Sequence, residues 1–552
     1  MNIAGALQNA LSGLQAAQTN MQLISSNISN AQTPGYSRET VQMTPALLNG
    51  AGAGVILSLP QRQINQSLAA SARVQDTAAS GANVANTYFQ QIQDLFGQVN
   101  DGSSLSDTYG QFTSALQTLS TTPDDQISQQ NLVATAQTLA GQLNSMSSGI
   151  QAIRSSADGD ISNDIQTVNT ALQSIAQYNT EITHMKATGQ ATAALEDQRD
   201  QALDQVSQLM GVSDFVRPNG TMVVFTSTGQ MLVDSTASQL SYTQSGAVTA
   251  QTPMSAVTLN GVDITSDITT GSIGTLLNLR DQQLPNLTAE LNQFATNLYN
   301  SAQVTSSSQL VTVGGTAPAA GDTFTVSING GATVTTAPLP ANPTLTDVVN
   351  AINAAVGAGT VTASVNGNNI AFTDTAGSNL NVAVTATVGG ETFSGSAANL
   401  PFHLFSGVNT AAPAPQDNAA TIAVNPTIAA SPGLLFGATG NPDPTIAQTL
   451  NNAVTAVQSF AAAGNFGGAT STTLSDYSAQ ILGQAANASS AASDNATFQA
   501  TLQQQLQARA SNVSGVNIDQ EMAQVTVYQN MYQASANVLS AVQNMLDTLL
   551  KM

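Results

Sequence analysis

Cysteine and tryptophan are absent from the 552 residues, and basic residues are few. Without cysteine the chain has no disulfide, no thiol nucleophile and no thiolate metal ligand. It holds 10 Lys and Arg against 32 Asp and Glu, for a net charge of −22, and no basic residue lies between Arg280 and Arg509. Binding of nucleic acid requires clustered Lys and Arg, so nucleic acid is excluded as a partner. Anionic membrane surfaces are disfavoured for the same reason.

Long apolar runs are also missing. No stretch of about 18 consecutive apolar residues is present, so the sequence predicts no membrane-spanning helix. The first residues lack a basic segment followed by an apolar run, so we expect no cleaved signal peptide. If the protein leaves the cell, it is expected to leave by another route.

The N-terminal segment carries no Asp, Glu, Lys or Arg over its first 37 positions. Apolar residues recur there with a period of seven, in two columns that alternate steps of four and three. The columns are Ile3, Ala10, Ala17 and Ile24, and Leu7, Leu14, Met21 and Ile28. This spacing predicts a helix of about 26 residues with a coiled-coil seam. Residues 30–36 should end it, because Pro34-Gly35 suits the centre of a type II turn.

The C-terminal segment has the same period. Its columns are Met531, Ser535, Val538, Val542, Met545 and Leu549, and Val525, Tyr532, Leu539 and Leu546. Two heptad helices at the ends of one chain most simply pair with each other. We therefore expect a helical base from which the chain leaves and to which it returns.

Between the ends, the period of the apolar residues changes four times, near 212, 284, 306 and 440. Residues 61–211 are predicted to form several helices of moderate length, with breaks at "DGSS", "TTPDD" and "SSADGD". Residues 212–283 contain strand patterns, and residues 306–435 are predicted to be mainly β. The fold class is therefore α+β and multidomain, with a discontinuous helical base. The expected domains are a terminal coiled-coil core (1–60 with 510–552), a helical bundle (61–211 with 284–305 and 440–509), an attached β-rich segment (212–283) and an inserted outer β domain (306–435).

Candidate chemical sites are weak. Residues 158–164, "DGDISND", resemble the start of a calcium loop, but Asn163 and Asn169 replace its required Gly and Glu, so a polar turn and helix N-cap is preferred. His184 and His403 have no metal-ligand spacing. Glu196, Arg199 and Asp200 are interpreted as surface ion pairs. We expect no catalytic residue, no cofactor and no metal, and hence no enzyme.

Both ends resemble a known group of proteins. "ALSGLQAAQTNMQLISSNISNAQTPGYSRE" is similar to the N-terminal signature of bacterial flagellar axial proteins, and "SGVNIDQEMAQVTVYQNMYQASANVLSAVQNMLDTLLKM" is similar to their C-terminal helix. "LEDQRDQALDQVSQLMGV", the block at 271–303 and "NAATIAVNPTIAASP" resemble the hook-associated protein 1 family of the rod and hook superfamily. The resemblance covers roughly 1–305 and 415–552. Residues 306–400 match nothing and stay unassigned.

The resemblance implies a structural component of the flagellum that self-assembles at the hook tip and joins hook to filament. It implies export without a cleaved signal peptide through the flagellar type III apparatus, and an extracellular location at the hook–filament junction. Implied partners are copies of the chain, the hook protein, the next junction or filament protein, and a cytosolic export chaperone at the C-terminal region. Terminal helices would be disordered in the monomer and paired in the assembly.

The residues expected at the assembly interface come from both ends and from the turn: Leu7, Leu11, Leu14, Met21, Ile24, Ile28, Pro34, Gly35, Tyr36, Tyr532, Val538, Leu539, Val542, Leu546 and Leu549. Alternatives are another axial component, such as the hook protein or a neighbouring junction protein, or a secreted surface adhesin. The long helical region argues against the hook protein. An adhesin would be favoured by aromatic clusters or a basic groove, and the sequence has neither.

Overall fold

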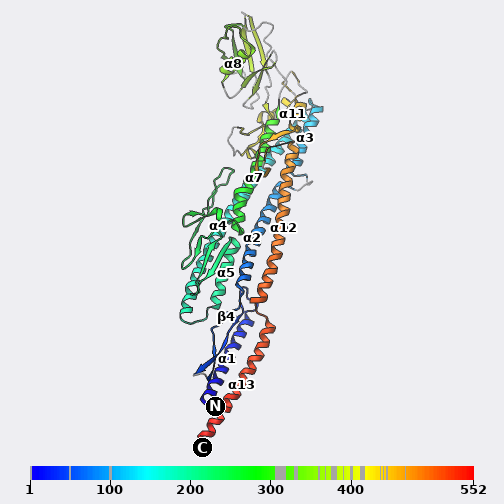
Figure 1. Ribbon diagram of the computed structural model, residues 1–552. Helices are drawn as coiled ribbons and strands as arrows, with labels where there is room; N and C mark the ends of the chain where they lie inside the picture. The colour runs from blue at the N-terminus through cyan, green and yellow to red at the C-terminus, as the bar shows by residue number, and fades with distance from the viewer. Residues whose placement is uncertain are drawn as a thin grey trace.

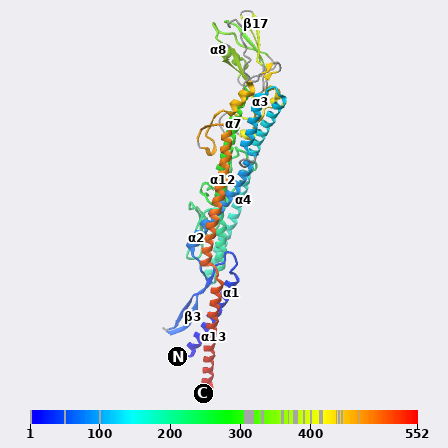
Figure 2. The same ribbon diagram turned by 90° about the vertical axis from the view of Figure 1, so that its right-hand side faces the viewer.

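The computed structural model is a long rod with both chain termini at one end and helix α8 (Leu345–Val356) at the other (Figure 1). A view turned by 90° has the same narrow outline (Figure 2). The structure describes residues 3–48, 51–97, 102–304, 319–328, 333–357, 361–366, 369–374, 382–388, 391–397, 402–410, 417–435, 437–438, 441–442, 445–466 and 468–551.

The two terminal helices lie side by side at the base of the rod. Helix α1 spans Ile3–Ser29 and helix α13 spans Ile518–Lys551, so the helices predicted at both ends are confirmed. They run in opposite directions, as the two labelled termini indicate (Figure 1). After α1, the strands β1 (Glu39–Thr40) and β4 (Gln61–Arg62) pair and lead into the helical stack.

Between β1 and β4, the chain forms an antiparallel hairpin. Strand β2 is Met43–Leu48 and strand β3 is Ala51–Leu57. The hairpin packs on α1.

The middle of the rod is a stack of helices around the main apolar core. Its helices are α2 (Gln66–Phe96), α3 (Leu105–Thr121), α4 (Gln126–Ala187), α5 (Ala193–Leu209), α7 (Leu284–Ser301), α11 (Thr445–Thr455) and α12 (Leu474–Ser514). Ser104 starts α3 with a capping box, and Asp125 caps α4. These caps account for the predicted breaks at 101–104 and 121–125, because each satisfies free backbone amides of a new helix.

The predicted break at 155–160 is wrong. Helix α4 runs through it without interruption for 62 residues, and Asp158 is fully buried in it. The Asp158 carboxylate accepts hydrogen bonds from the Tyr242 hydroxyl, from the Ser245 backbone at 2.7 Å and from Arg280 at 3.3 Å. Its partners therefore lie far away in the sequence, and it neither caps a helix nor forms a turn.

Two small sheets and a helix with a π-helical turn follow α5. The strands are β5 (Val212–Val216), β6 (Met222–Thr226) and β7 (Met231–Val233) in one sheet, and β8 (Leu240–Ser241), β9 (Thr258–Leu259) and β10 (Val262–Asp263) in the other. Helix α6 (Gly271–Asn278) then continues through a π-helical turn, Leu279–Gln283, into α7. The predicted change from helix to strand at Val212 is confirmed.

The outer end of the rod is a separate module with its own apolar core. It contains α8 and the strands β12 (Thr323–Ile328), β13 (Thr333–Thr335), β14 (Val361–Asn366), β15 (Asn369–Asp374), β16 (Val382–Val388) and β17 (Glu391–Ala397). Leu404, Ile422 and Ile428 belong instead to the main core. The module is therefore shorter than the expected interval 306–435. Several parts of that interval, the longest of them 306–318, lie outside the described residues.

Short elements join the module to α7 and α11, or join α11 to α12. They are β11 (Gln303–Val304), β18 (Phe402–His403), β19 (Phe405–Ser406), α9 (Asn418–Thr421), β20 (Ala423–Val424), α10 (Pro426–Ala430), β21 (Gly437–Ala438), β22 (Asn441–Pro442), β23 (Gln458–Phe460) and β24 (Thr470–Thr472). Tyr109 packs edge-on against Phe294 at 5.8 Å and donates to the Val454 carbonyl at 2.7 Å, which ties α3, α7 and α11 together.

Candidate assembly interface

The seam between α1 and α13 is narrow and antiparallel. A β-carbon added at Gly13 would come 3.8 Å from the Ser535 β-carbon, and the Asn27 amide donates to Glu521 at 3.3 Å. Both contacts fit one register, because Gly13 and Asn27 are as far apart as Glu521 and Ser535. The α1 residues on this seam are mostly small or polar: Ala10, Gly13, Ala17, Asn20, Ile24 and Asn27, all buried. Small residues let the two backbones approach closely.

The β2–β3 hairpin covers a second face of α1. The Val55 backbone amide donates to the Ser12 hydroxyl at 3.2 Å, and Gly54 lies against the same side chain with a φ of +112°. Ala16, one turn further along, is 1% exposed. Because successive helical residues are about 100° apart, Ser12 and Ala16 lie on a different face from the α13 seam.

The third face of α1 has no cover within the described residues, and it holds most of the predicted α1 interface residues. Leu11 is 48% exposed. Leu7, Leu14, Met21 and Ile28 are half-buried. Ile24, also predicted, points instead into the α13 seam and is 3% exposed.

The predicted residues of α13 divide in the same way. Val542 is 2% exposed and lies in the seam, whereas Tyr532, Val538 and Leu546 are between 37% and 48% exposed. Leu539 is half-buried. The side chain of Leu549 lies outside the described residues. By helical phase, Tyr532, Leu539 and Leu546 flank the seam on the same side as the uncovered face of α1.

We call this surface the open face: Leu7, Leu11, Leu14, Met21 and Ile28 of α1 with Val525, Tyr532, Leu539 and Leu546 of α13. It is apolar and lies along both helices. It also lacks charge, because residues 3–37 and 522–546 contain no Asp, Glu, Lys or Arg. Contiguous exposed apolar surface of this kind marks an interaction site in soluble proteins.

The turn after α1 is type II, as the sequence predicts. The Tyr36 amide donates to the Thr33 carbonyl at 3.2 Å, and Gly35 has a φ of +75°, which glycine adopts without strain. Pro34 and Gly35 are exposed. Helix α5 holds the turn, because Gln201 donates to the Pro34 carbonyl at 3.1 Å.

A buried polar network joins this turn to the C-terminal helix. Asn27 is its centre: its side-chain oxygen accepts from the Tyr36 hydroxyl at 2.8 Å and from the Glu39 backbone at 3.1 Å. Its amide donates to the Glu39 carbonyl at 3.0 Å and to Glu521. The Arg38 guanidinium donates to Glu521 at 2.6 Å. Asn27, Tyr36, Arg38, Glu39 and Glu521 form what we call the junction network.

Burial shifts the pKa of two of its members. Burial raises the pKa of Tyr36 above its ordinary value, with a smaller contribution from the nearby acid Glu39. Burial also raises the pKa of Glu39, and the negative charge of Asp197 raises it further. Both groups therefore keep their protons more firmly than they would in water.

A second charged cluster fastens the junction network to α5. Arg62 contacts Glu196 at 3.1 Å, Asp197 at 2.7 Å and Asp200 at 2.8 Å, and its side chain is 6% exposed. Burial opposes its charge, but Asp200 and Asp197 outweigh burial and raise the pKa of Arg62. The Ser37 amide also donates to Asp197 at 3.0 Å.

The surface ion pairs expected at Glu196, Arg199 and Asp200 are therefore wrong. Arg199 is 2% exposed and donates to the Asn179 side chain at 3.1 Å and to the Gly220 carbonyl at 2.6 Å. Glu196 and Asp200 pair with Arg62 from a different element. Helical spacing alone does not reveal Arg62 as the partner of Glu196 and Asp200, because Arg62 lies more than 100 residues away from them in the sequence.

Sequence reasoning missed the polar members of the junction network. Asn27, Arg38 and Glu521 all lie inside the two terminal motifs. The predicted interface was chosen mainly from the apolar heptad positions, so it did not include them. One signal was available: Arg38 is the first charged residue after 37 uncharged positions. A charge at the edge of such a segment needs a partner when it is buried.

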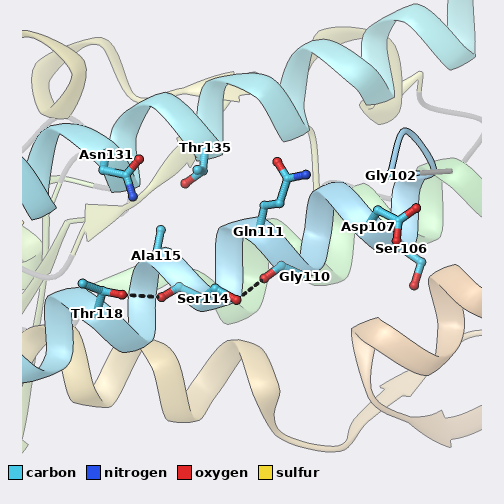
Figure 3. Close-up of a pocket in the computed structure, with 10 residues that line it drawn as sticks. All are labelled: Gly102, Ser106, Asp107, Gly110, Gln111, Ser114, Ala115, Thr118, Asn131 and Thr135. Carbon is cyan, nitrogen blue, oxygen red and sulfur yellow. Dashed lines mark hydrogen bonds between the residues drawn. The ribbon is translucent and has the colours of Figure 1, made fainter. Parts of the chain in front are cut away.

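Elsewhere, the described residues offer little chemistry. A groove of about 650 Å³ lies between α3 and α4, where Asn131 and Thr135 of α4 face Gln111 and Ala115 of α3 (Figure 3). The Ser114 and Thr118 hydroxyls donate to backbone carbonyls of α3 itself. The carboxylate of the groove, Asp107, is held by the Ser104 capping box. No group of three or more His, Cys, Asp or Glu among the described residues is arranged to hold a metal ion. In the same part of the chain, every helix is too short or too polar to cross a bilayer.

Three family models match separate parts of the chain. The flagellar hook-associated protein FlgK helical domain matches residues 89–309. The flagella basal body rod protein model matches residues 7–36, and the flagellar basal body rod FlgEFG protein C-terminal model matches residues 507–552. The last two models cover α1 with its turn, and α13.

A solved structure of the flagellar hook junction protein FlgK from Burkholderia pseudomallei is also similar. It has a TM-score of 0.48 and 19% sequence identity, and the match covers 81% of this chain and 100% of that chain.

Known relatives agree with the family models. Flagellar hook-associated protein 1 of Escherichia coli K12 and that of Salmonella typhimurium LT2 are each 29% identical over 300 residues, which is 52% of this chain and 54% of theirs. The Bacillus subtilis protein of the same name is 22% identical over 240 residues, or 41% of this chain and 47% of its own. The chain spans about half the length of the curated relatives it matches. The family models and these relatives thus show that the chain is similar to flagellar hook-associated protein 1 over about half of its length.

Proposed function

We propose that the protein is a structural component of the bacterial flagellum that assembles at the hook tip and joins hook to filament. The observation that carries the proposal is the meeting of the two terminal motifs. They lie about 500 residues apart in sequence, yet they form one helix pair with an uncovered apolar face. The role proposed is structural and not catalytic.

Charge supports self-association through this pair. The chain has a net charge of −22, so two copies repel each other over most of their surfaces. The open face is free of charge, and its burial leaves no unpaired ion behind. We therefore assign the open face to contacts between copies, with the hook protein and the next junction or filament protein as further partners in the axis.

Export before assembly is part of the proposal. The flagellar type III route would deliver the chain to the outside of the cell. Helix α13 exposes several large apolar side chains in the single chain, among them Met522, Val527 and Met545, each more than half exposed. Such a surface would need cover in the cytosol, which supports a chaperone at the C-terminal region.

Electron microscopy of cells lacking this chain tests the function. We expect bare hooks on the cell and filament subunits shed into the medium, because nothing would retain the filament. Filaments that stay attached and look normal would overturn the proposal and favour the alternative of a surface adhesin.

Charges placed on the open face test the interface. Leu14→Asp and Leu539→Asp each put a carboxylate into the proposed contact, and we expect loss of incorporation while the helical stack stays folded. Gln533→Asp, at an exposed position of α13 outside the open face, is the matched control and should incorporate normally. Normal incorporation of both leucine variants would remove the open face from the interface.

A further inference from the structure

The facing positions of the α1–α13 seam recur every seven residues. Gly13, Asn20 and Asn27 lie seven residues apart on α1, and Glu521, Tyr528 and Ser535 lie seven apart on α13. A slide of one heptad would bring the same two columns of positions together again. The two helices therefore need another feature to choose between registers.

Glu521 is that feature by its position and its charge. Among the described residues of α1 and α13, it is the only charged side chain that is buried, at 1% exposed. Its carboxylate accepts hydrogen bonds from the Arg38 guanidinium at 2.6 Å and from the Asn27 amide at 3.3 Å. A slide of one heptad moves it about 10 Å along the helix and away from Arg38. The carboxylate would then be buried without a cation, which is strongly unfavourable.

Arg38 cannot follow such a slide, because its backbone is fixed to the helical stack. Its amide donates to the Ser514 carbonyl at 2.8 Å, at the end of α12. Its carbonyl accepts from the Gln63 amide at 2.8 Å, and its guanidinium donates to the Gln63 side chain at 3.2 Å. The position of the guanidinium is thus set by the rod.

We propose that Glu521 is a positioning residue whose ion pair with Arg38 sets the register of α13 against α1. The rod thereby determines which residues of the two helices together make up the open face. A slipped pair would be equally helical but would present a different surface to the next copy. The inference concerns pairing within one chain, so it stands or falls independently of the proposed function.

Engineered cysteines can report the register, because the natural chain has none. Gly13→Cys with Ser535→Cys matches the native register, since the β-carbon distance of 3.8 Å suits a disulfide. Two further pairs report a slipped register: Ala6→Cys with Ser535→Cys, and Asn20→Cys with Ser535→Cys. Each of these disulfides would form only after α13 slides by one heptad, in one direction for the first pair and in the other direction for the second. In the otherwise natural full chain, we expect oxidation to yield the 13–535 disulfide in at least about tenfold excess over the other two.

The decisive variant removes the ion pair but keeps the volume apolar: Arg38→Met with Glu521→Leu. Buried ion pairs can be replaced in this way with little loss of stability, so the helices should still pair. We expect the excess of the 13–535 disulfide to fall to about threefold or less while helical circular dichroism is retained. Asp519→Asn, an exposed acid two residues from Glu521, is the control and should leave the ratio unchanged.

Three results would overturn the proposal. The first is equal yields of all three disulfides in the natural background, which would mean that the chain has no set register. The second is an unchanged ratio in the double variant. The third is loss of all three disulfides in the double variant, which would assign the ion pair to helix pairing as such and not to register.

Discussion

Glu290 in α7 accepts a hydrogen bond of 2.7 Å from the backbone amide of Asn465, although 175 residues separate them. The carboxyl is fully buried, and none of the ion pairs in the described structure involves it. The Gln484 amide lies 3.2 Å from it when its nitrogen faces the carboxyl. The nearby hydroxyl of Tyr477 has no partner among the described residues. Burial raises the pKa of Glu290 from 4.5 to about 7, although the Asn465 amide opposes the shift.

This raised pKa predicts a pH-dependent stability. The folded chain holds the Glu290 proton more firmly than the unfolded chain does, so the stabilising contribution is full below pH 4.5 and is lost as the pH rises through about 7. Glu290→Gln should abolish this loss. Above neutral pH it should gain about 3 kcal/mol in the free energy of unfolding relative to the natural chain.

Denaturant titrations at pH 5 and pH 8 measure the difference. Asp494→Asn, at an exposed acid of α12, is the control and should show no comparable gain. A gain from Glu290→Gln that is the same at both pH values would contradict the prediction.

Gly13→Leu should separate α1 from α13. The added side chain would collide with Ser535, whose hydroxyl oxygen would lie 2.9 Å from the new β-carbon. We expect a cost of about 1–3 kcal/mol to the helix pairing and faster amide exchange in both helices. Gly5→Leu raises helix propensity by the same amount in open space, where nothing lies within 4 Å, and should not speed exchange. Equal exchange in the two variants would mean that the seam is not closed in solution.

Asp158→Ala should be among the most destabilising changes in the helical stack. It removes the buried carboxylate that accepts from the Ser245 amide at 2.7 Å and from Arg280 at 3.3 Å. Arg280 keeps its ion pair with Asp281 at 2.7 Å, so we expect a loss of about 3 kcal/mol in the free energy of unfolding. Arg217→Met breaks the ion pair with Asp234, in which the arginine side chain is 42% exposed, and should cost less than about 1 kcal/mol. Thermal unfolding of the two variants side by side tests this order, and similar losses would refute it.

Gly35→Ala should loosen the turn that follows α1. A β-carbon there strains the backbone at a φ of +75° and overlaps Gln201, which holds the Pro34 carbonyl. Gly189→Ala is the control: Gly189 has a φ of +69°, so the backbone strain is nearly the same, but no atom lies within 4 Å of the added β-carbon. The difference in unfolding free energy between the two variants therefore measures the clash with Gln201. We expect Gly35→Ala to cost about 1 kcal/mol more. Amide exchange at Ser37 measures the local opening, and no change there would argue that Gln201 adapts freely.

Much of the fold could be predicted from local signals. The bounds of α1, the type II turn at Pro34-Gly35 and the change to strands at Val212 each depend on residues close together in sequence. The prediction failed at Asp158 and Arg199, where polar side chains are buried inside helices. Their partners come from other elements, so no local pattern distinguishes them from residues of a turn or of the surface.

For the proposed assembly interface too, some features follow from local sequence and others only from the tertiary structure. The sequence by itself determined that both ends form heptad helices, that the N-terminal 37 residues are free of charge, and that a rigid turn ends the first helix, because periodicity, composition and turn chemistry are local properties. Only the tertiary structure decided that Ala10, Gly13 and Ala17 form the seam while Leu11 stays exposed and Leu14 half-buried. It also decided that Asn27, Arg38 and Glu521 meet. Two helices with the same repeat can pair in several ways, and the choice depends on close backbone contact and on buried charge that must find its partner.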